Sequence, residues 1–167
     1  MLVKTFANKQ RILLNSEHYF PVDSFKIAKE MADIHFVESE HIGSEILCIV
    51  TKRPNERPVF IVNDLHQSYM VCIQTMAICI GKYLLETQQK SRYITYVRYH
   101  DEWEEQDDSL LFAYEFLLPE EHVIELIKEG YSLFDLSNHF MVSSWFVKER
   151  LKLIDGVTNV RGKLVYR

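Results

Sequence analysis

The sequence lacks the usual marks of a secreted, membrane-spanning or nucleic-acid-coating protein. Its 3 cysteines form no C-x-x-C pair and lie in apolar runs, which indicates buried, reduced thiols and no disulfide. The first 14 residues are interrupted by Lys4 and by residues 8–11, so they suit neither a signal peptide nor a membrane span. A net charge of −5 disfavours a broad nucleic-acid-binding surface. We therefore expect a cytoplasmic protein, with no membrane contact, whose partner is another protein.

Glycine and proline are also scarce, at 5 and 4 of 167 residues, and the chain has no internal repeat and no low-complexity tract. The composition is 47% hydrophobic and 13% aromatic, which is typical of a chain that buries a sizeable core. This length favours one domain spanning residues 1–167, because two would each have a small core.

The hydrophobic periodicity predicts a series of short elements around one long apolar helix. Residues 67–86 are apolar around most of a helix, which indicates burial on several sides. The other predicted elements are a first helix at 22–31 capped by Asp23 or Ser24, strands at 46–51, 58–62 and 93–99, helices at 108–118, 120–128, 133–140 and 144–154, and a strand pair or loose end at 157–166. We expect an α+β fold with a small mixed or antiparallel sheet of about three strands, a central buried helix and a helical C-terminal half.

Several segments, taken in order, resemble one peptidase family. Residues 59–63 (V-F-I-V-N) and 73–85 (I-Q-T-M-A-I-C-I-G-K-Y-L-L) match the layout of a strand ending in Asn followed by the helix F-T-L-A-H-E-L-G-H-Y-L-L. Residues 112–119 (F-A-Y-E-F-L-L-P) resemble F-A-x-x-L-L-M-P, and residues 133–153 resemble a closing L-A-x-x-F-x-V-S plus R-L segment. Over residues 22–154 the chain thus resembles the ImmA/IrrE zinc metallopeptidases, which implies a zincin-like domain.

The residues that carry the chemistry of that family are replaced here. In an H-E-x-x-H helix two histidines bind zinc and the glutamate acts as general base. The resemblance puts Ile78, Cys79 and Lys82 at those three positions, and Asp108 at the position of the third ligand. An isoleucine binds no metal, and a lysine brings positive charge to the place of a cation. We therefore expect no catalytic residue, no metal and no cofactor, and hence no peptidase activity by the family's mechanism.

Lys82 and Asp108 raise a further hypothesis, because both carry charge at the degenerate site. They could form an ion pair between two helices where the family has a metal bridge; alternatively, both side chains reach solvent.

Other side chains are candidates for an unorthodox metal or nucleophilic site, but none has a recognised signature. Cys72 and Cys79 are seven residues apart in the central helix, and without a histidine partner they indicate core thiols and not nucleophiles. The histidine and acid groupings, which we expect to be ordinary surface residues, are His100 with Glu104, His122 with Glu125, and Glu38, Glu40 and His41.

The C-terminal segment 133–143 resembles the first half of a helix-turn-helix. The helix after it would present Lys148, Arg150 and Lys152, but its large apolar side, including Trp145, favours packing on the domain core. DNA binding is therefore the less favoured interpretation.

The acidic segment 101–108 is a candidate docking element for a partner, with Trp103, Glu104 and Glu105 as its candidate contact residues; its alternative is a solvated acidic loop.

The resemblance implies a bacterial or phage regulator that binds a transcriptional repressor, or another regulator of a phage or mobile element, without cleaving it. Such a protein would be a non-catalytic antirepressor or adaptor. Two other classes of function stay open: an active peptidase with an unorthodox site, and a DNA-binding regulator. Turnover of a bound partner would separate an enzyme from a binding module.

Overall fold

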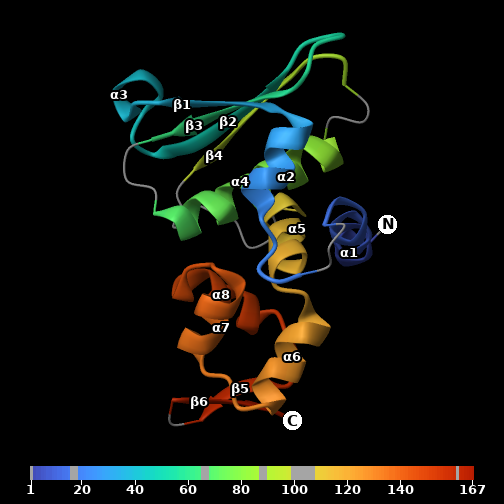
Figure 1. Cartoon of the computed structure of the whole chain (residues 1–167), viewed down its shortest axis with the longest axis vertical. Helices are drawn as coiled ribbons and strands as arrows, with labels where there is room; N and C mark the ends of the chain where they lie inside the picture. The colour runs from blue at the N-terminus through green and yellow to red at the C-terminus, as the bar shows by residue number, and fades with distance from the viewer. Residues whose placement is uncertain (1, 16–18, 65–67, 87–89, 99–107, 161) are drawn as a thin grey trace.

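The structure of the chain is a computed structural model that describes residues 2–15, 19–64, 68–86, 90–98, 108–160 and 162–167. It has the expected α+β architecture, with a sheet at one end and a helical C-terminal part at the other (Figure 1). The helices are α1 (Val3–Leu14), α2 (Ser24–Met31), α3 (Ser39–Ile42), α4 (Tyr69–Glu86), α5 (Asp108–Leu117), α6 (Glu120–Lys128), α7 (Leu133–Phe140) and α8 (Ser144–Lys152). The strands are β1 (Asp33–Val37), β2 (Ile46–Lys52), β3 (Val59–Asn63), β4 (Tyr93–Arg98), β5 (Val157–Val160) and β6 (Lys163–Tyr166).

The larger sheet has the strand order β1-β3-β2-β4. β1 runs parallel to β3, whereas β2 is antiparallel to both β3 and β4, so the sheet is mixed. We expected about three strands and missed β1. It is a five-residue edge strand in which polar Asp33 and His35 alternate with Ile34 and Phe36, and so short an alternation is a weak signal.

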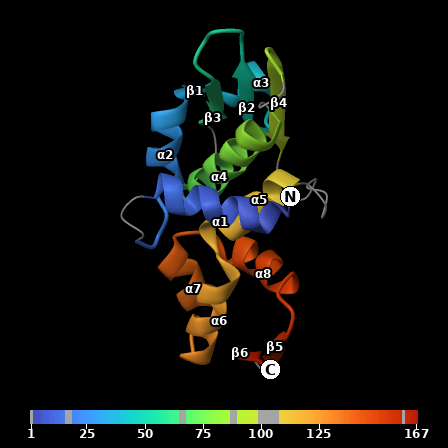
Figure 2. The same ribbon diagram turned by 90° about the vertical axis from the view of Figure 1, so that its right-hand side faces the viewer.

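One face of this sheet packs on α4, and the other is open in the described part of the molecule (Figures 1 and 2). Cys48, Val50, Phe60 and Val62 lie on the covered face and are buried, as the two-residue alternation of strands requires. On the open face of β4, by contrast, Ile94 is 74% exposed.

α4 is the buried central helix that the sequence predicted. Every residue from Ile73 to Gly81 is buried, because the sheet covers one side of the helix and α5 packs on another. The contact with α5 depends on Gly81: a Cβ built there would lie 2.8 Å from Cδ1 of Phe112 and 3.1 Å from the carbonyl oxygen of Ser109. The two helices therefore approach more closely than an alanine would allow.

α1 was not predicted, so the expectation that the first helix begins at residue 22 was wrong. α1 packs against α5, with the rings of Phe6 and Phe112 6.1 Å apart. Phe6 and Ala7 are the only buried residues of α1, so its apolar pattern is short. The helix therefore depends on this tertiary contact, which the sequence alone does not show. The small α3 was also missed. The Asp23 cap of α2 is confirmed, since its side chain accepts from the backbone N–H of Lys26 at 2.9 Å.

The C-terminal helices and the predicted strand pair are confirmed, and local signals explain their boundaries. Pro119 is the N-cap of α6, and Gly130, with φ of 95°, follows its C-terminus. Ser132 and Asp135 form a capping box at the start of α7, Met141 ends that helix in the left-handed conformation, and Ser143 caps α8. α7 and α8 thus form a helix-turn-helix, followed directly by the β5–β6 hairpin.

Candidate functional site

The α4 positions that the resemblance relates to a zinc site are packed into the core. Ile78 is only 3% exposed, and Cys79 is completely buried. Lys82, one turn further along, keeps 12% of its side chain exposed. At these three positions only the ammonium group of Lys82 reaches solvent, and none of the side chains is a carboxylate or an imidazole.

The expected ion pair between Lys82 and Asp108 does not form among the residues that the structure describes. The carboxylate found beside Lys82 is that of Glu86, with Nζ and Oε1 3.8 Å apart. Glu86 lies four residues further along the same helix, so this pair follows from helical geometry and needs no second helix. Asp108 begins α5 and is exposed.

The three cysteines are free thiols on two neighbouring elements. Cys48 of β2 and Cys79 of α4 are buried together between the sheet and the helix, and Cys72 is half-buried. Burial raises the pKa of the Cys48 thiol well above its usual range, and the neighbouring Cys79 adds to the shift. Burial likewise raises the pKa of Cys72 to about 11. Cys48 and Cys72 are therefore protonated at neutral pH and are poor nucleophiles and poor metal ligands.

A zinc ion does not fit the residues at this site. A catalytic zinc needs three protein ligands with nitrogen, oxygen or thiolate donors. Ile78 has no donor atom, Cys79 lies inside the core, and the Lys82 ammonium repels a cation. Asp108 alone would be the single carboxylate at the former site, which is too few ligands for a catalytic zinc ion.

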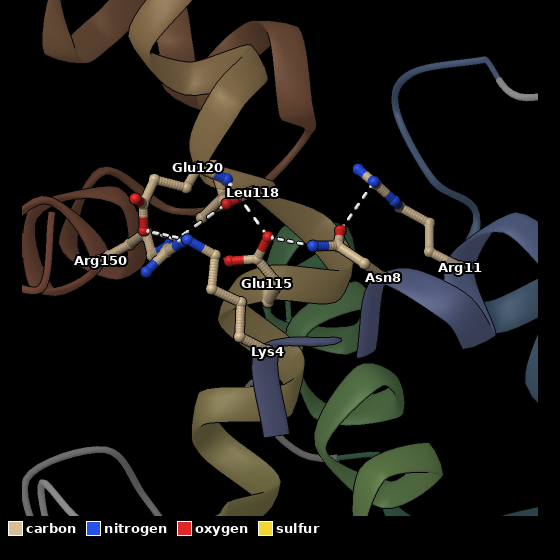
Figure 3. Close-up of polar contacts among 7 residues, drawn as sticks. All are labelled: Lys4, Asn8, Arg11, Glu115, Leu118, Glu120 and Arg150. Carbon is tan, nitrogen blue, oxygen red and sulfur yellow. Dashed lines mark hydrogen bonds and ion pairs between the residues drawn. The ribbon is translucent and has the colours of Figure 1, made fainter. Parts of the chain in front are cut away.

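A polar cluster that the sequence did not reveal lies where α1, α5, α6 and α8 meet (Figure 3). Its centre is an ion pair between Glu115, 3% exposed, and Arg150, 6% exposed. Arg150 also donates from Nε to the carbonyl of Leu118 at 3.2 Å and lies 3.5 Å from the Glu120 carboxylate. Burial lowers the pKa of Arg150, whereas Glu115 and Glu120 act in the opposite direction.

The N-terminal helix contributes the other half of this cluster. Asn8 donates to Oε1 of Glu115 at 2.8 Å and accepts from Arg11, also at 2.8 Å. Lys4 lies 2.9 Å from the second carboxylate, that of Glu120 (Figure 3). Both oxygens of Glu115 thus have partners, so the carboxylate joins helices and is not free to act as an acid or base.

Arg150 corrects the expectation about the helix-turn-helix segment. We grouped Arg150 with Lys148 and Lys152 as the basic side chains of α8, but only the two lysines are exposed. Lys152 is paired with Glu149 of the same helix at 2.6 Å. The apolar side of α8 packs inward as expected, with Phe146 and Val147 fully buried.

A cavity of about 440 Å³ adjoins the polar cluster between α1 and α6. Burial lowers the pKa of Arg11, the cationic side chain among the lining residues, while Glu115 and Glu121 oppose that shift. The cavity is lined by Asn8, Arg11, Ile12, Asn15, Phe20, Glu115, Pro119, Glu121, His122 and Glu125.

The structure describes two of the three groupings of histidines and acids that the sequence offered. Ligand atoms of Glu38, Glu40 and His41 lie within 4.8 Å of one another, but all three residues are exposed. His122 and Glu125 do make contact, with Nδ1 and Oε2 3.4 Å apart. The pair His100 and Glu104, and the docking residues Trp103, Glu104 and Glu105, lie outside the described residues.

His139 is the partner that sequence reasoning missed. Its Nε2 lies 3.2 Å from Nε2 of His122, across the contact between α7 and α6. The two residues are 17 positions apart in the chain, so no local spacing could have related them.

No family model matches this chain, and no curated protein sequence matches it. None of the helices in the described part of the chain is long and apolar enough to span a membrane.

Proposed function

We propose that this chain is a catalytically inactive relative of the ImmA/IrrE peptidases, of zincin-like fold, that binds a transcriptional repressor or another regulator of a phage or mobile element without cleaving it. The observation that carries this proposal is the packing of Ile78 and Cys79 into the core, at the positions where the family has its first histidine and its glutamate. A helix adapted in this way gains stability from apolar burial and has no group that could activate water.

The arrangement around α4 supports the same proposal. The sheet covers the helix, and α5, which begins at Asp108, crosses it at Gly81. A helix under a sheet, followed by a second helix that begins with an acid, is the order that the resemblance implies. With the chemistry absent, the property left for selection to maintain is the surface, and the net charge of −5 favours a protein partner over DNA.

The docking element that we propose is the acidic segment 101–108. Trp103 supplies an aromatic anchor, and Glu104 and Glu105 supply charge that a basic regulator would complement.

The test is to mix the full chain with each DNA-binding regulator encoded beside its gene, and to follow both proteins by size-exclusion chromatography and intact-mass spectrometry. A stoichiometric complex with uncleaved partner is expected. The variant Trp103→Ala/Glu104→Lys/Glu105→Lys should weaken the complex, whereas Glu56→Lys, an exposed acid in the β2–β3 turn, should not. Cleavage of the partner, or no complex with any of these regulators, would contradict the proposal.

DNA binding is a second candidate function, because the β5–β6 hairpin follows the α7–α8 helix-turn-helix directly, as a wing would. Lys148 of α8 and Lys163 of the hairpin are both exposed. A mobility-shift assay at about 50 mM salt tests this candidate, since contacts to phosphate are strongest at low salt. Binding that falls in Lys148→Glu but not in Lys9→Glu would support it, and the absence of any shift would dismiss it.

A further inference from the structure

The two histidines between α6 and α7 point their ring nitrogens at each other. The Nε2 atoms of His122 and His139 are 3.2 Å apart, while the ring centroids are 5.3 Å apart, so both nitrogens lie between the rings. A tetrahedral ion with metal–nitrogen distances of about 2.0–2.1 Å holds two imidazole nitrogens roughly 3.3 Å apart. The observed separation is therefore close to the one that a shared metal ion requires.

Both rings are held in place by aromatic neighbours. Phe20 stacks on His122 with centroids 4.6 Å apart and an interplanar angle of 20°, and Phe140 meets both histidines edge-on. Tyr131 meets the other side of His139 at 90°. Rings fixed by packing lose little further freedom when they bind a ligand, which is the preorganisation that a metal site needs.

Glu125 lies beside the outer ring nitrogen of His122. Its carboxylate is 3.4 Å from Nδ1, and in the tautomer that carries its proton on Nδ1 the lone pair of Nε2 faces His139. A carboxylate behind a ligating histidine is the usual outer partner in metal sites. A metal ion would bind the Nε2 lone pairs of both rings, each ring then carrying its proton on Nδ1.

The electrostatic surroundings favour a cation bound by neutral imidazoles. Burial and the neighbouring His122 lower the pKa of His139, against an opposing effect of Glu129, so the ring is neutral at neutral pH. Glu121 and Glu125 line the adjoining cavity. The one cationic side chain among the lining residues, Arg11, is already bonded to Asn8.

From this geometry we propose that His122 and His139 form a binding site for a late first-row divalent cation, of which Zn²⁺ is the representative. The ion joins α6 to α7 through the two Nε2 atoms. The side chain of His122 remains 29% exposed toward the cavity, so water or a donor from a bound partner completes the coordination. Imidazole nitrogens select zinc, copper or nickel over magnesium or calcium, which prefer oxygen ligands. This inference does not depend on the proposed function.

The experiment is calorimetric titration of the tag-free full chain with zinc chloride at neutral pH, followed by the same titration with magnesium chloride. A single zinc ion per chain with micromolar affinity is expected, with no detectable magnesium binding. His122→Gln and His139→Gln should each weaken zinc binding by about tenfold or more, and Glu125→Gln by about tenfold, since even outer-shell partners contribute that much.

The matched controls are His41→Gln, which removes the exposed Glu38, Glu40 and His41 grouping, and Cys72→Ser. Neither should change the zinc affinity. Zinc binding that persists in both His122→Gln and His139→Gln, or that only a control variant abolishes, would overturn the proposal. So would the absence of binding at millimolar zinc. None of these outcomes alters the partner-binding test, so the two proposals fail independently.

A measurement on the unaltered protein tests the same site without any variant. Long-range ¹H–¹⁵N spectra resolve the ring nitrogens of each histidine. The Nε2 resonances of His122 and His139 should shift together on addition of zinc and saturate at the same ratio. A shift of one ring without the other would contradict a bridging ion.

Discussion

Two buried regions of this molecule differ in polarity: the core around α4 is apolar, whereas the contact between α5 and α8 contains charged groups. Around α4, the positions that resemble a peptidase centre have become apolar or thiol side chains, with Ile78 and Cys79 in the core. Around α5 and α8, a carboxylate and a guanidinium are buried together, with a partner for each charge. Among the residues that the structure describes, the charged side chains that are buried lie where several helices converge to satisfy them.

The largest effect is expected when a charge is placed at the buried Cys79 position of α4. Cys79→Glu would bury a carboxylate against Cys48 and the sheet, and we expect it to lower the free energy of unfolding by about 4 kcal/mol or more at neutral pH, because the charge has no partner there. The loss should shrink as the pH falls and the new carboxyl is protonated. Urea unfolding at several pH values measures it, with Cys79→Ala as the control for lost volume. A stable Cys79→Glu protein would mean that this site is open to water.

The converse change removes charge from the polar cluster. Arg150→Ala leaves the buried Glu115 without its counter-ion, and we expect a loss of about 3–5 kcal/mol in the free energy of unfolding. The double variant Glu115→Leu/Arg150→Met should recover most of that loss, because no unpaired charge remains. Chemical denaturation compares the three proteins. A loss below about 1 kcal/mol in Arg150→Ala would indicate a pair that water reaches, as at exposed salt bridges.

The contact between α4 and α5 is the boundary between the two regions, and Gly81 tests its tightness. Gly81→Ala would bring a methyl group to 2.8 Å from Cδ1 of Phe112, and we expect a loss of about 1–3 kcal/mol from overpacking. Adding Phe112→Leu should relieve the clash, so that Gly81→Ala costs less in that background. A double-mutant cycle by thermal or urea unfolding measures this coupling. Purely additive effects would contradict the close approach of these helices.

The sequence predicted the elements that carry their own signals. The long apolar run of α4, the short β-rich runs of β2 and β3, the alternation in β4 and the helical periodicity of α5 to α8 are all local patterns, and the structure confirms these elements. α1, β1 and α3 were missed, because α1 and β1 are stabilised mainly by contacts with distant segments and α3 is a single short turn. The degenerate α4 positions followed from a motif, and their burial followed from the apolar run around them.

The polar cluster and the histidine pair could not be predicted for a related reason. Glu115 and Arg150 are 35 residues apart, and Asn8 is 107 residues from Glu115. Each residue alone suggests an ordinary helix surface, and only the packing of four helices makes the group a buried network. The expected Lys82–Asp108 pair failed for the opposite reason: Glu86, four residues further along the same helix, lies close to Lys82.

The smallest effect on stability is expected for Asp135, whose charge lies at the surface and not in the interior. Hydrogen bonds from the Ser132 side chain and backbone lower the pKa of Asp135 in the capping box of α7. Because the folded pKa is depressed, this stabilisation is fully present above the unfolded value of about 3.9 and is lost as the pH falls through the folded one. Asp135→Asn should therefore be slightly less stable than the parent protein at neutral pH and equal to it at the acid end of the range. Urea unfolding at each pH measures the difference in the free energy of unfolding, with the exposed Asp155→Asn as control. A protonated carboxyl no longer accepts these bonds as an anion. A difference between parent and variant that widened toward acid pH would therefore contradict the capping role.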